Sequence, residues 1–275
     1  MHPMVNIALA AARKAGEIIA RAADRLDMIE VGRKSGNDFV TEIDRAAERE
    51  IISQLRKAYP EHLILAEESG ASGDVARAGG YQWIIDPLDG TTNFMRGIPH
   101  FAVSIACVRD GRLEHAVVLD PVRREEFTAT RGAGAQRNGR RIRVSTRAGL
   151  KEAVLGTGIP FCEPSIKELP AYLQTLEQFA SRTAGIRRAG AAALDLAYVA
   201  AGRLDGFWEI GLRPWDIAAG ALLVQEAGGL ISDFDGGNDW MESGRIVAAN
   251  PKCLKAMLQV IRPALGSAAT EPLPG

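Results

Sequence analysis

The stretch Trp83-Ile84-Ile85-Asp86-Pro87-Leu88-Asp89-Gly90-Thr91-Thr92-Asn93-Phe94 combines a short apolar run with a polar turn. The apolar run is typical of a buried strand. Proline and glycine then interrupt it, two aspartates lie three positions apart, and hydroxyl residues follow. Because proline fixes φ, we expect the strand to end at Pro87 and both carboxylates to turn towards one point.

That point has the character of a cation site. The carboxylates of Asp86 and Asp89 do not both ionise comfortably at close range without a cation between them, and we expect the Leu88 carbonyl to face the same point. Oxygen donors favour Mg²⁺, Mn²⁺ or Ca²⁺, and a site with few protein ligands and room for water favours Mg²⁺. The alternative is a turn whose acids are solvated.

An anion site is predicted directly after it. Gly90, Thr91 and Thr92 lead into a predicted helix, where free N–H groups and the close approach that glycine permits favour phosphate. A cation site beside a phosphate site predicts hydrolysis of a phosphate ester, in which Mg²⁺ activates water and screens the leaving oxygen.

Further acids occupy equivalent positions in the chain. Glu67 and Glu68 follow the apolar run 63–66, and Asp216 follows Trp215 at a helix start, where the helix dipole stabilises an acid. A solvated loop or a helix cap explains each of them alone. Together they indicate ligands that converge on the first two aspartates.

The bulk properties place few limits on partners. Hydrophobic residues make up 47% of the 275 residues and the net charge is −1, so the chain has ample core, and no membrane partner or strong sequence-wide nucleic-acid signal is indicated. The three cysteines form no CxxC pair, the N-terminal residues argue against a signal peptide, and no apolar run is long enough to span a bilayer. We expect a cytoplasmic protein.

Periodicity predicts alternating helices and strands. Helices are predicted over 6–26, 41–57, 164–182, 191–202, 215–227 and 251–261. Further strands are predicted over 63–66, 101–109, 113–120, 126–130, 154–158, 207–210, 230–234 and 245–249, with irregular segments over 31–38 and 67–80. Asp110-Gly111 predicts a two-residue hairpin inside an antiparallel meander. These patterns favour an α/β fold of layered sheets and helices, with one domain over 1–265 and a frayed tail over 266–275.

Three segments resemble the inositol monophosphatase family. They are Ala66-Glu67-Glu68-Ser69, the stretch from Trp83 to Phe94, and Trp215-Asp216-Ile217-Ala218-Ala219-Gly220. Their order and separations also fit, and the similarity runs from the start of the chain to about residue 261. The segments 99–106 and 193–203 resemble the bacterial SuhB-like branch. The resemblance implies the layered αβαβα sandwich of the inositol monophosphatase/fructose-1,6-bisphosphatase superfamily, and a homodimer.

The resemblance also implies a metal centre. Its ligands to two or three Mg²⁺ ions would be Glu67, Asp86, the Leu88 carbonyl, Asp89 and Asp216. Glu67 and Thr91 would position and activate the attacking water, with the Thr91 hydroxyl linked to Asp44, for which helix capping is the alternative role. Lithium would inhibit by replacing one Mg²⁺. Lys34 would add positive charge nearby, unless it is a solvated lysine.

A substrate site follows from the same resemblance. Its residues would be Leu88, Asp89, Gly90, Thr91, Arg187, Gly190, Ala191, Ala192 and Glu209. The N–H groups of Gly90 and Thr91 would hold phosphate, Glu209 would accept hydrogen bonds from sugar hydroxyls, and residues 190–192 would contact the ring through their backbone. Many relatives carry a hydroxyl residue at position 191. Arg187 and its neighbour Arg188 are alternatively a surface or dimer-interface pair.

Two classes of function remain open. The first is a phosphatase for a small-molecule phosphate ester, inositol 1-phosphate, attacked directly by metal-activated water; fructose 1,6-bisphosphate, a 3′-phosphonucleotide or NADP are alternative substrates. The second is a non-catalytic role in ribosomal RNA antitermination, with transcription antitermination factors or RNA polymerase as partners. The arginine-rich segment 131–147 is then a basic patch, or else a solvated hairpin face. Gly156-Thr157-Gly158 lacks the third glycine of a dinucleotide fingerprint.

Overall fold

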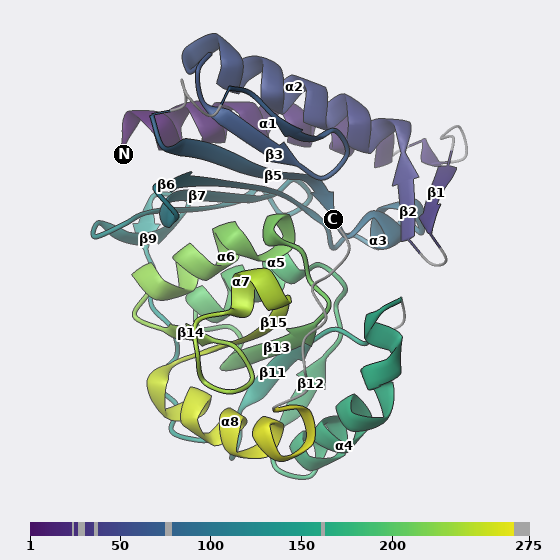
Figure 1. Ribbon diagram of the computed structural model, residues 1–275, viewed down its shortest axis with the longest axis vertical. Helices are drawn as coiled ribbons and strands as arrows, with labels where there is room; N and C mark the ends of the chain where they lie inside the picture. The colour runs from purple at the N-terminus through teal and green to yellow at the C-terminus, as the bar shows by residue number, and fades with distance from the viewer. Residues whose placement is uncertain (24, 27–30, 36–37, 75–78, 161–162, 267–275) are drawn as a thin grey trace.

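Five layers build the molecule. The computed structural model describes residues 1–23, 25–26, 31–35, 38–74, 79–160 and 163–266. From top to bottom, Figure 1 shows α1 and α2, a large sheet, α5 and α6, a smaller sheet, and finally α4 and α8. The αβαβα sandwich predicted above is confirmed. Apolar side chains fill each of the spaces between layers, so every sheet is covered on both faces.

The helices differ in how much of their surface is apolar. They are α1 (Pro3–Ala23), α2 (Glu42–Ala58), α3 (Thr91–Met95), α4 (Leu169–Ala180), α5 (Ala192–Ala200), α6 (Pro214–Glu226), α7 (Trp240–Ser243) and α8 (Pro251–Leu265), with a 3₁₀ turn at Ser165–Glu168. The outer helix α1 buries one face, whereas α6 is buried all round from Ile217 to Val224 because a sheet covers each side of it. None of these helices has the length and apolarity that a bilayer crossing requires.

The larger sheet carries the central stretch of sequence. Its order is β10-β9-β8-β7-β6-β5-β3-β4. The strands are β3 (Leu63–Ala66), β4 (Gly70–Ser72), β5 (Tyr81–Asp89), β6 (Ala102–Arg109), β7 (Arg112–Asp120), β8 (Glu125–Thr130), β9 (Gly134–Arg137) and β10 (Arg140–Arg141). Strands β6 to β8 form the predicted antiparallel meander, which β5, β9 and β10 extend, and the hairpin at Asp110-Gly111 has φ of 49° and 77°, as a type I′ turn requires.

The smaller sheet is of mixed direction. Its order is β12-β11-β13-β15-β14, built from β11 (Val154–Thr157), β12 (Gly185–Arg187), β13 (Gly206–Ile210), β14 (Leu230–Ser232) and β15 (Arg245–Ala249). Strand β11 pairs in parallel with β12 and β13, while β13, β15 and β14 are antiparallel. The described cysteines, Cys107 and Cys253, are buried free thiols in the cores.

Several predicted boundaries are wrong. The segment 31–38, predicted to be irregular, contributes β1 (Val31–Ser35), which pairs with β2 (Asp38–Thr41), and β4 lies within the predicted loop 67–80. Neither β12 nor α7 was predicted. Strand β5 also does not end at Pro87: it continues to Asp89 across an irregularity in its pairing with β6. Proline is tolerated there because the ladder of hydrogen bonds is already interrupted. Most of the predicted frayed tail, 267–275, lies outside the described residues.

Candidate active site

The irregularity in β5 shapes the first part of the site. Asp86 is 2% exposed and its Oδ1 accepts a hydrogen bond from the Leu88 N–H at 2.9 Å. The Leu88 side chain is buried in the core beneath α1, which fixes the turn from below. Both aspartates are therefore held at one end of β5, as the sequence predicts.

Asp216 is brought to Asp86 by the second half of the chain. Asp86 pairs with Ser104 in β6, and the Ser104 hydroxyl donates to the Trp215 carbonyl at 3.1 Å. Asp216 then caps α6, because its Oδ2 accepts from the Arg213 N–H at 2.7 Å. One side-chain contact between β6 and α6 thus places a third acid beside the first two.

Two further contacts complete the acidic group. Glu67 follows β3, and its N–H donates to the Ile85 carbonyl at 3.1 Å, directly before Asp86. Asp89 Oδ2 accepts from the Ala193 N–H at 2.7 Å, in the first turn of α5. The predicted metal ligands therefore come from β5, from the turn after β3 and from α6, and a backbone N–H of α5 meets them there.

This gathering of like charges perturbs the acids strongly. Burial raises the pKa of Asp86 well above its ordinary value, and the carboxylates of Glu67, Asp89 and Asp216 raise it further. Burial also raises the pKa of Asp89, with Asp216 as the next cause. In the described part of the chain, no three acidic, histidine or cysteine side chains already surround an ion-sized point. The donor set, all oxygen and rich in carboxylates, nevertheless fits Mg²⁺ in both chemistry and charge.

Two of the predicted catalytic residues, Thr91 and Asp44, are in contact. The Thr91 hydroxyl lies 3.0 Å from Asp44 Oδ1 and 3.1 Å from the Leu88 carbonyl, both of which are acceptors for its single proton. Asp44 is 1% exposed in the first turn of α2. It therefore orients the hydroxyl in addition to any effect on its helix. Lys34 falls in β1, whose side chains lie outside the described part.

The predicted phosphate turn packs against the predicted ring-binding segment. Gly90 has φ of 93°, and a Cβ there would lie 3.0 Å from the His100 carbonyl and 3.3 Å from Ala191 Cβ, so only glycine fits. The Asn93 side-chain amide donates to the carbonyls of His100 and Ala189, each at 2.8 Å. Sequence reasoning missed Asn93, because its role depends on residues about a hundred positions away.

The segment before α5 lines the other side. Ala191 and Ala192 are 1% and 6% exposed, and Gly190 has φ of 85°. Arg187 is exposed and its guanidinium donates to the neighbouring Ile186 carbonyl. The charge that acts on the site comes from Arg188, since it lowers the pKa of Glu209. Consecutive residues of an extended segment point in opposite directions, and this separates the two arginines.

Glu209 has an acidic neighbour that the sequence did not single out. Burial raises the pKa of Glu209 to about 8, and the next causes are Asp195 and Asp216. Asp195 lies in the first turn of α5, is 2% exposed, and has its own pKa raised to about 8 by burial. The available signal was an ionisable residue within an otherwise apolar predicted helix.

Comparison with known proteins gives consistent matches along the chain. Residues 1–265 match the inositol monophosphatase family. The chain is 62% identical over 265 residues to a Pseudomonas aeruginosa protein named Nus factor SuhB, covering 96% of this chain and 98% of that one. It superposes with a TM-score of 0.91 on the extragenic suppressor protein SuhB of Bartonella henselae, at 43% identity and covering 95% and 99% of the two chains. The IMPase of Thermotoga maritima gives 0.86 at 37% identity, covering 96% and 98%.

Proposed function

This chain belongs to the inositol monophosphatase family, and on that premise we propose that it is a Mg²⁺-dependent phosphomonoesterase for inositol 1-phosphate. The observation that carries the proposal is the group of buried acids at the end of β5, beside the turn at Gly90 and Thr91. Such a group costs stability unless a cation neutralises it, and a phosphate-binding turn next to a cation site suits hydrolysis of a phosphate ester.

The acids would hold the metal. Two or three Mg²⁺ ions would be ligated by Glu67, Asp86, Asp89, Asp216 and the Leu88 carbonyl. Bound there, Mg²⁺ would supply Lewis acidity and neutralise the charge that develops on the phosphoryl group and the leaving oxygen. Because these residues come from β5, from the turn after β3 and from α6, the fold sets their approach before any ion binds.

Thr91 and Glu67 would position the water. The Thr91 hydroxyl proton is directed at Asp44 or at the Leu88 carbonyl, so the oxygen lone pairs stay available to accept a proton from water. Glu67 supplies a second acceptor next to Asp86. The N–H groups of Gly90 and Thr91 would hold the phosphate, and water would attack the phosphorus directly with no phosphoenzyme.

The alcohol would leave towards α5 and β13. Glu209 would accept hydrogen bonds from its hydroxyl groups, and the backbone of Gly190, Ala191 and Ala192 would contact the ring. Alanine at position 191 offers no hydroxyl, so ring recognition there would depend on backbone groups and shape.

A substrate panel tests this function. We expect phosphate release from inositol 1-phosphate that requires Mg²⁺, stops with EDTA and is inhibited by lithium, with a higher kcat/KM than for fructose 1,6-bisphosphate, a 3′-phosphonucleotide or NADP. Hydrolysis that favours one of these other substrates would reassign the substrate. Absence of hydrolysis with every ester at saturating Mg²⁺ would refute the phosphatase.

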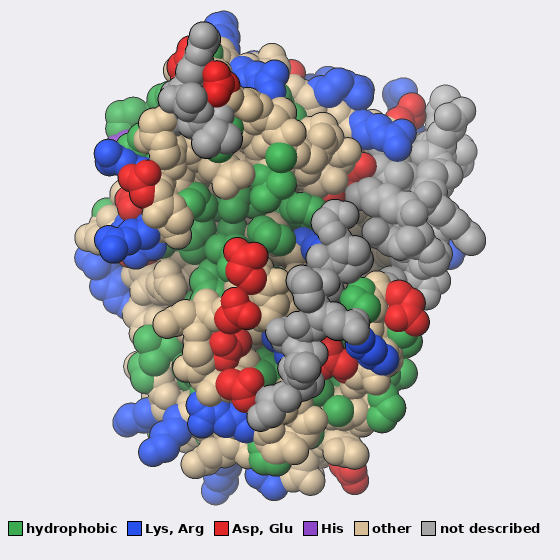
Figure 2. All heavy atoms as spheres, in the orientation of Figure 1, with side chains coloured by type: hydrophobic (Ala, Val, Ile, Leu, Met, Phe, Trp, Pro, Cys, Tyr) green, Lys and Arg blue, Asp and Glu red, His purple; other side chains and the backbone are tan. Residues whose placement is uncertain are grey.

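We also propose a second role as a transcription antitermination factor, because a relative 62% identical is named Nus factor SuhB. Arg140, Arg141 and Arg143 are exposed near β10, which provides a local basic surface. Figure 2 shows that Lys and Arg side chains on one face of the molecule lie mostly towards its rim, without a continuous basic surface.

A pull-down tests the second role. Transcription factors and RNA polymerase should bind the wild-type protein and a catalytically inactive Asp89→Asn variant equally. Neutralising Arg140, Arg141 and Arg143 together should abolish this binding. Equal binding by the triple variant would remove the basic surface from the proposal.

A further inference from the structure

A buried acid in α5 has no evident structural role. Asp195 is 2% exposed, and its carboxylate forms no side-chain hydrogen bond with any residue in the described ranges. Buried carboxyl groups are normally paired or hydrogen-bonded, because burial without a partner is costly. Asp205, another buried acid, shows the usual arrangement, since it accepts from the Val154 N–H at 2.8 Å and from Arg147 at 3.1 Å.

Two glycines, at positions 156 and 158, leave room for the carboxyl groups of Asp195 and Glu209. A Cβ on Gly156 would lie 3.5 Å from Asp195 Cγ, and a Cβ on Gly158 would overlap the Glu209 carboxylate at 1.7 Å. Residues two apart on an extended strand share a face and are roughly 7 Å apart. The carboxyl groups of Asp195 and Glu209 therefore lie over alternate positions of the chain, one in β11 and one directly after its end. This explains the glycines at 156 and 158, which form no dinucleotide fingerprint.

Both carboxyl groups border the reaction site. Asp195 lies in the first turn of α5, two residues after Ala193, whose N–H donates to Asp89 Oδ2 at 2.7 Å, and its charge raises the pKa of both Asp89 and Glu209. Arg188 acts on Asp195 and Glu209 alike. Asp195, Glu209 and Arg188, called the wall below, therefore lie within electrostatic reach of one another, and carboxyl groups with a pKa of about 8 can both donate and accept hydrogen bonds near neutral pH.

We propose that Asp195 is a specificity-determining residue which, together with Glu209, hydrogen-bonds hydroxyl groups of a polyol leaving group. A polyol fits this wall because each hydroxyl both donates and accepts a hydrogen bond. An apolar alcohol would leave the carboxyl groups without partners. The proposal rests on the proposed phosphatase activity for its place in the reaction, but polyol binding itself needs no turnover.

Binding and melting measurements test the proposal first. Titration of the Mg²⁺-loaded protein with myo-inositol should show affinity that falls about tenfold in Asp195→Asn, which keeps the shape of the side chain. Asp195→Leu should bind as weakly and, in the metal-free protein, melt about 2–5 °C above the wild type because an unpaired buried carboxyl is gone. The matched control Asp205→Asn should melt below the wild type and bind myo-inositol normally.

Kinetics with two esters give the second test. In Asp195→Asn, kcat/KM for inositol 1-phosphate should fall about tenfold, while that for p-nitrophenyl phosphate, which has no other hydroxyl, should change less than twofold. Equal losses on both esters would assign Asp195 a merely structural role and overturn the proposal. Unchanged myo-inositol affinity in both Asp195 variants, or no binding to the wild type, would overturn it as well.

The binding and kinetic measurements test the role of Asp195 and the phosphatase activity separately. A wild-type protein that hydrolyses neither ester refutes the phosphatase, while myo-inositol binding still decides the role of Asp195. If Asp195→Leu does not fold, Asp195→Asn carries the same binding and kinetic comparisons.

Discussion

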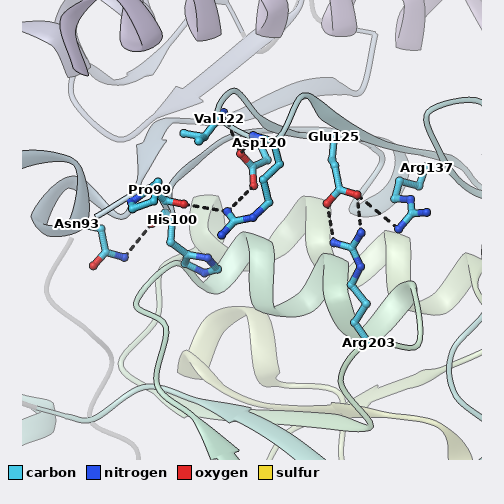
Figure 3. A network of polar contacts seen from close by, with 9 residues as sticks. Asn93, Pro99, His100, Asp120, Val122, Glu125, Arg137 and Arg203 are labelled. Carbon is cyan, nitrogen blue, oxygen red and sulfur yellow. Dashed lines mark hydrogen bonds and ion pairs between the residues drawn. The ribbon is translucent and has the colours of Figure 1, made fainter. Parts of the chain in front are cut away.

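Charged side chains gather in two regions of this molecule, and they do so in opposite ways. In the network of Figure 3, Arg203 donates two hydrogen bonds to Glu125, one of them at 2.5 Å, and Arg137 lies 3.4 Å from the same carboxylate. Arg123 donates to Asp120 at 3.0 Å in the same network. At the end of β5, in contrast, carboxylates meet other carboxylates.

The difference shows which region the fold maintains for stability and which for chemistry. Arg203 lowers the pKa of Glu125, so this acid prefers to be ionised in the folded protein. Burial and like charges do the reverse to Asp86. Opposite charges at a surface tie β8 to neighbouring segments at little cost, whereas buried like charges persist only where a ligand or a reaction needs them.

The largest expected effect comes from a substitution among the buried acids at the end of β5. Asp89→Asn should lower kcat for inositol 1-phosphate about 10³-fold or more, because it removes the charge of a proposed metal ligand whose Oδ2 also accepts from the Ala193 N–H. Steady-state kinetics at saturating Mg²⁺ check this. Glu125→Gln is the matched control and should keep full activity. Unchanged activity of the Asp89 variant would remove that residue from the centre.

A smaller loss is expected from Asn93. Without its amide, the turn at Gly90 and the Ala189 carbonyl lose the hydrogen bonds that hold them together, and misplacement by about 1 Å costs roughly 10²-fold in rate. We expect this loss in kcat/KM for Asn93→Ala and for Asn93→Asp, which keeps the shape and loses the donor. Full activity in Asn93→Asp would show that another contact holds the turn.

The contributions of Asp195 and Glu125 to the stability of the folded protein should depend on pH in opposite ways. Burial raises the pKa of Asp195 from 3.8 to about 8, so between these values the folded protein binds more protons than the unfolded chain. In metal-free protein this contribution to stability is present at acid pH and is lost as pH rises towards 8, by roughly 2–4 kcal/mol. Urea unfolding in EDTA at pH 5 and pH 8 should show the loss, and Asp195→Asn should reduce it. An unchanged slope in the variant would contradict the assignment.

The smallest expected effect comes from a substitution in the ion pairs around Glu125. Arg203→Lys loses the two-pronged contact with Glu125 and should lower the free energy of unfolding by about 1 kcal/mol or less, because the pair is partly exposed. Since the pKa of Glu125 is lowered, its contribution is present above about pH 4.5 and is lost as pH falls through the lowered pKa. Urea unfolding at pH 7 and pH 3 should therefore show a smaller difference between variant and wild type at pH 3.

The sequence predicts much of this site, for identifiable reasons. Turn residues and strand ends are local signals, so the order of residues alone places Asp86, Asp89 and Asp216 at element boundaries. It does not predict the continuation of β5 past Pro87, because the interruption that accommodates proline belongs to the pairing with β6. Asn93 was missed for a similar reason.

Other features that the sequence does not predict concern which way a side chain points, not where the residue lies in the chain. Arg187 and Arg188 are adjacent in sequence, and only the register of β12 decides which of them faces the site. Asp195 has an ordinary place in a helix, and its isolation becomes visible only when α5 is packed against β11. The pairing of β1 with β2 likewise joins two short segments without a strong apolar pattern.

The contact between Ser104 and Trp215 spans 111 residues, and the one between Asp89 and Ala193 spans 104. Each links the N-terminal sheet to a helix of the second half, so the ligand set is complete only after the two halves have docked. Binding of the proposed ion would then stabilise the docked arrangement of the two halves reversibly. At a hundredfold its Kd, an ion that binds only the folded chain adds about 2.7 kcal/mol to stability. The concentration of free Mg²⁺ would thereby set how often the halves separate and how long the chain survives proteolysis.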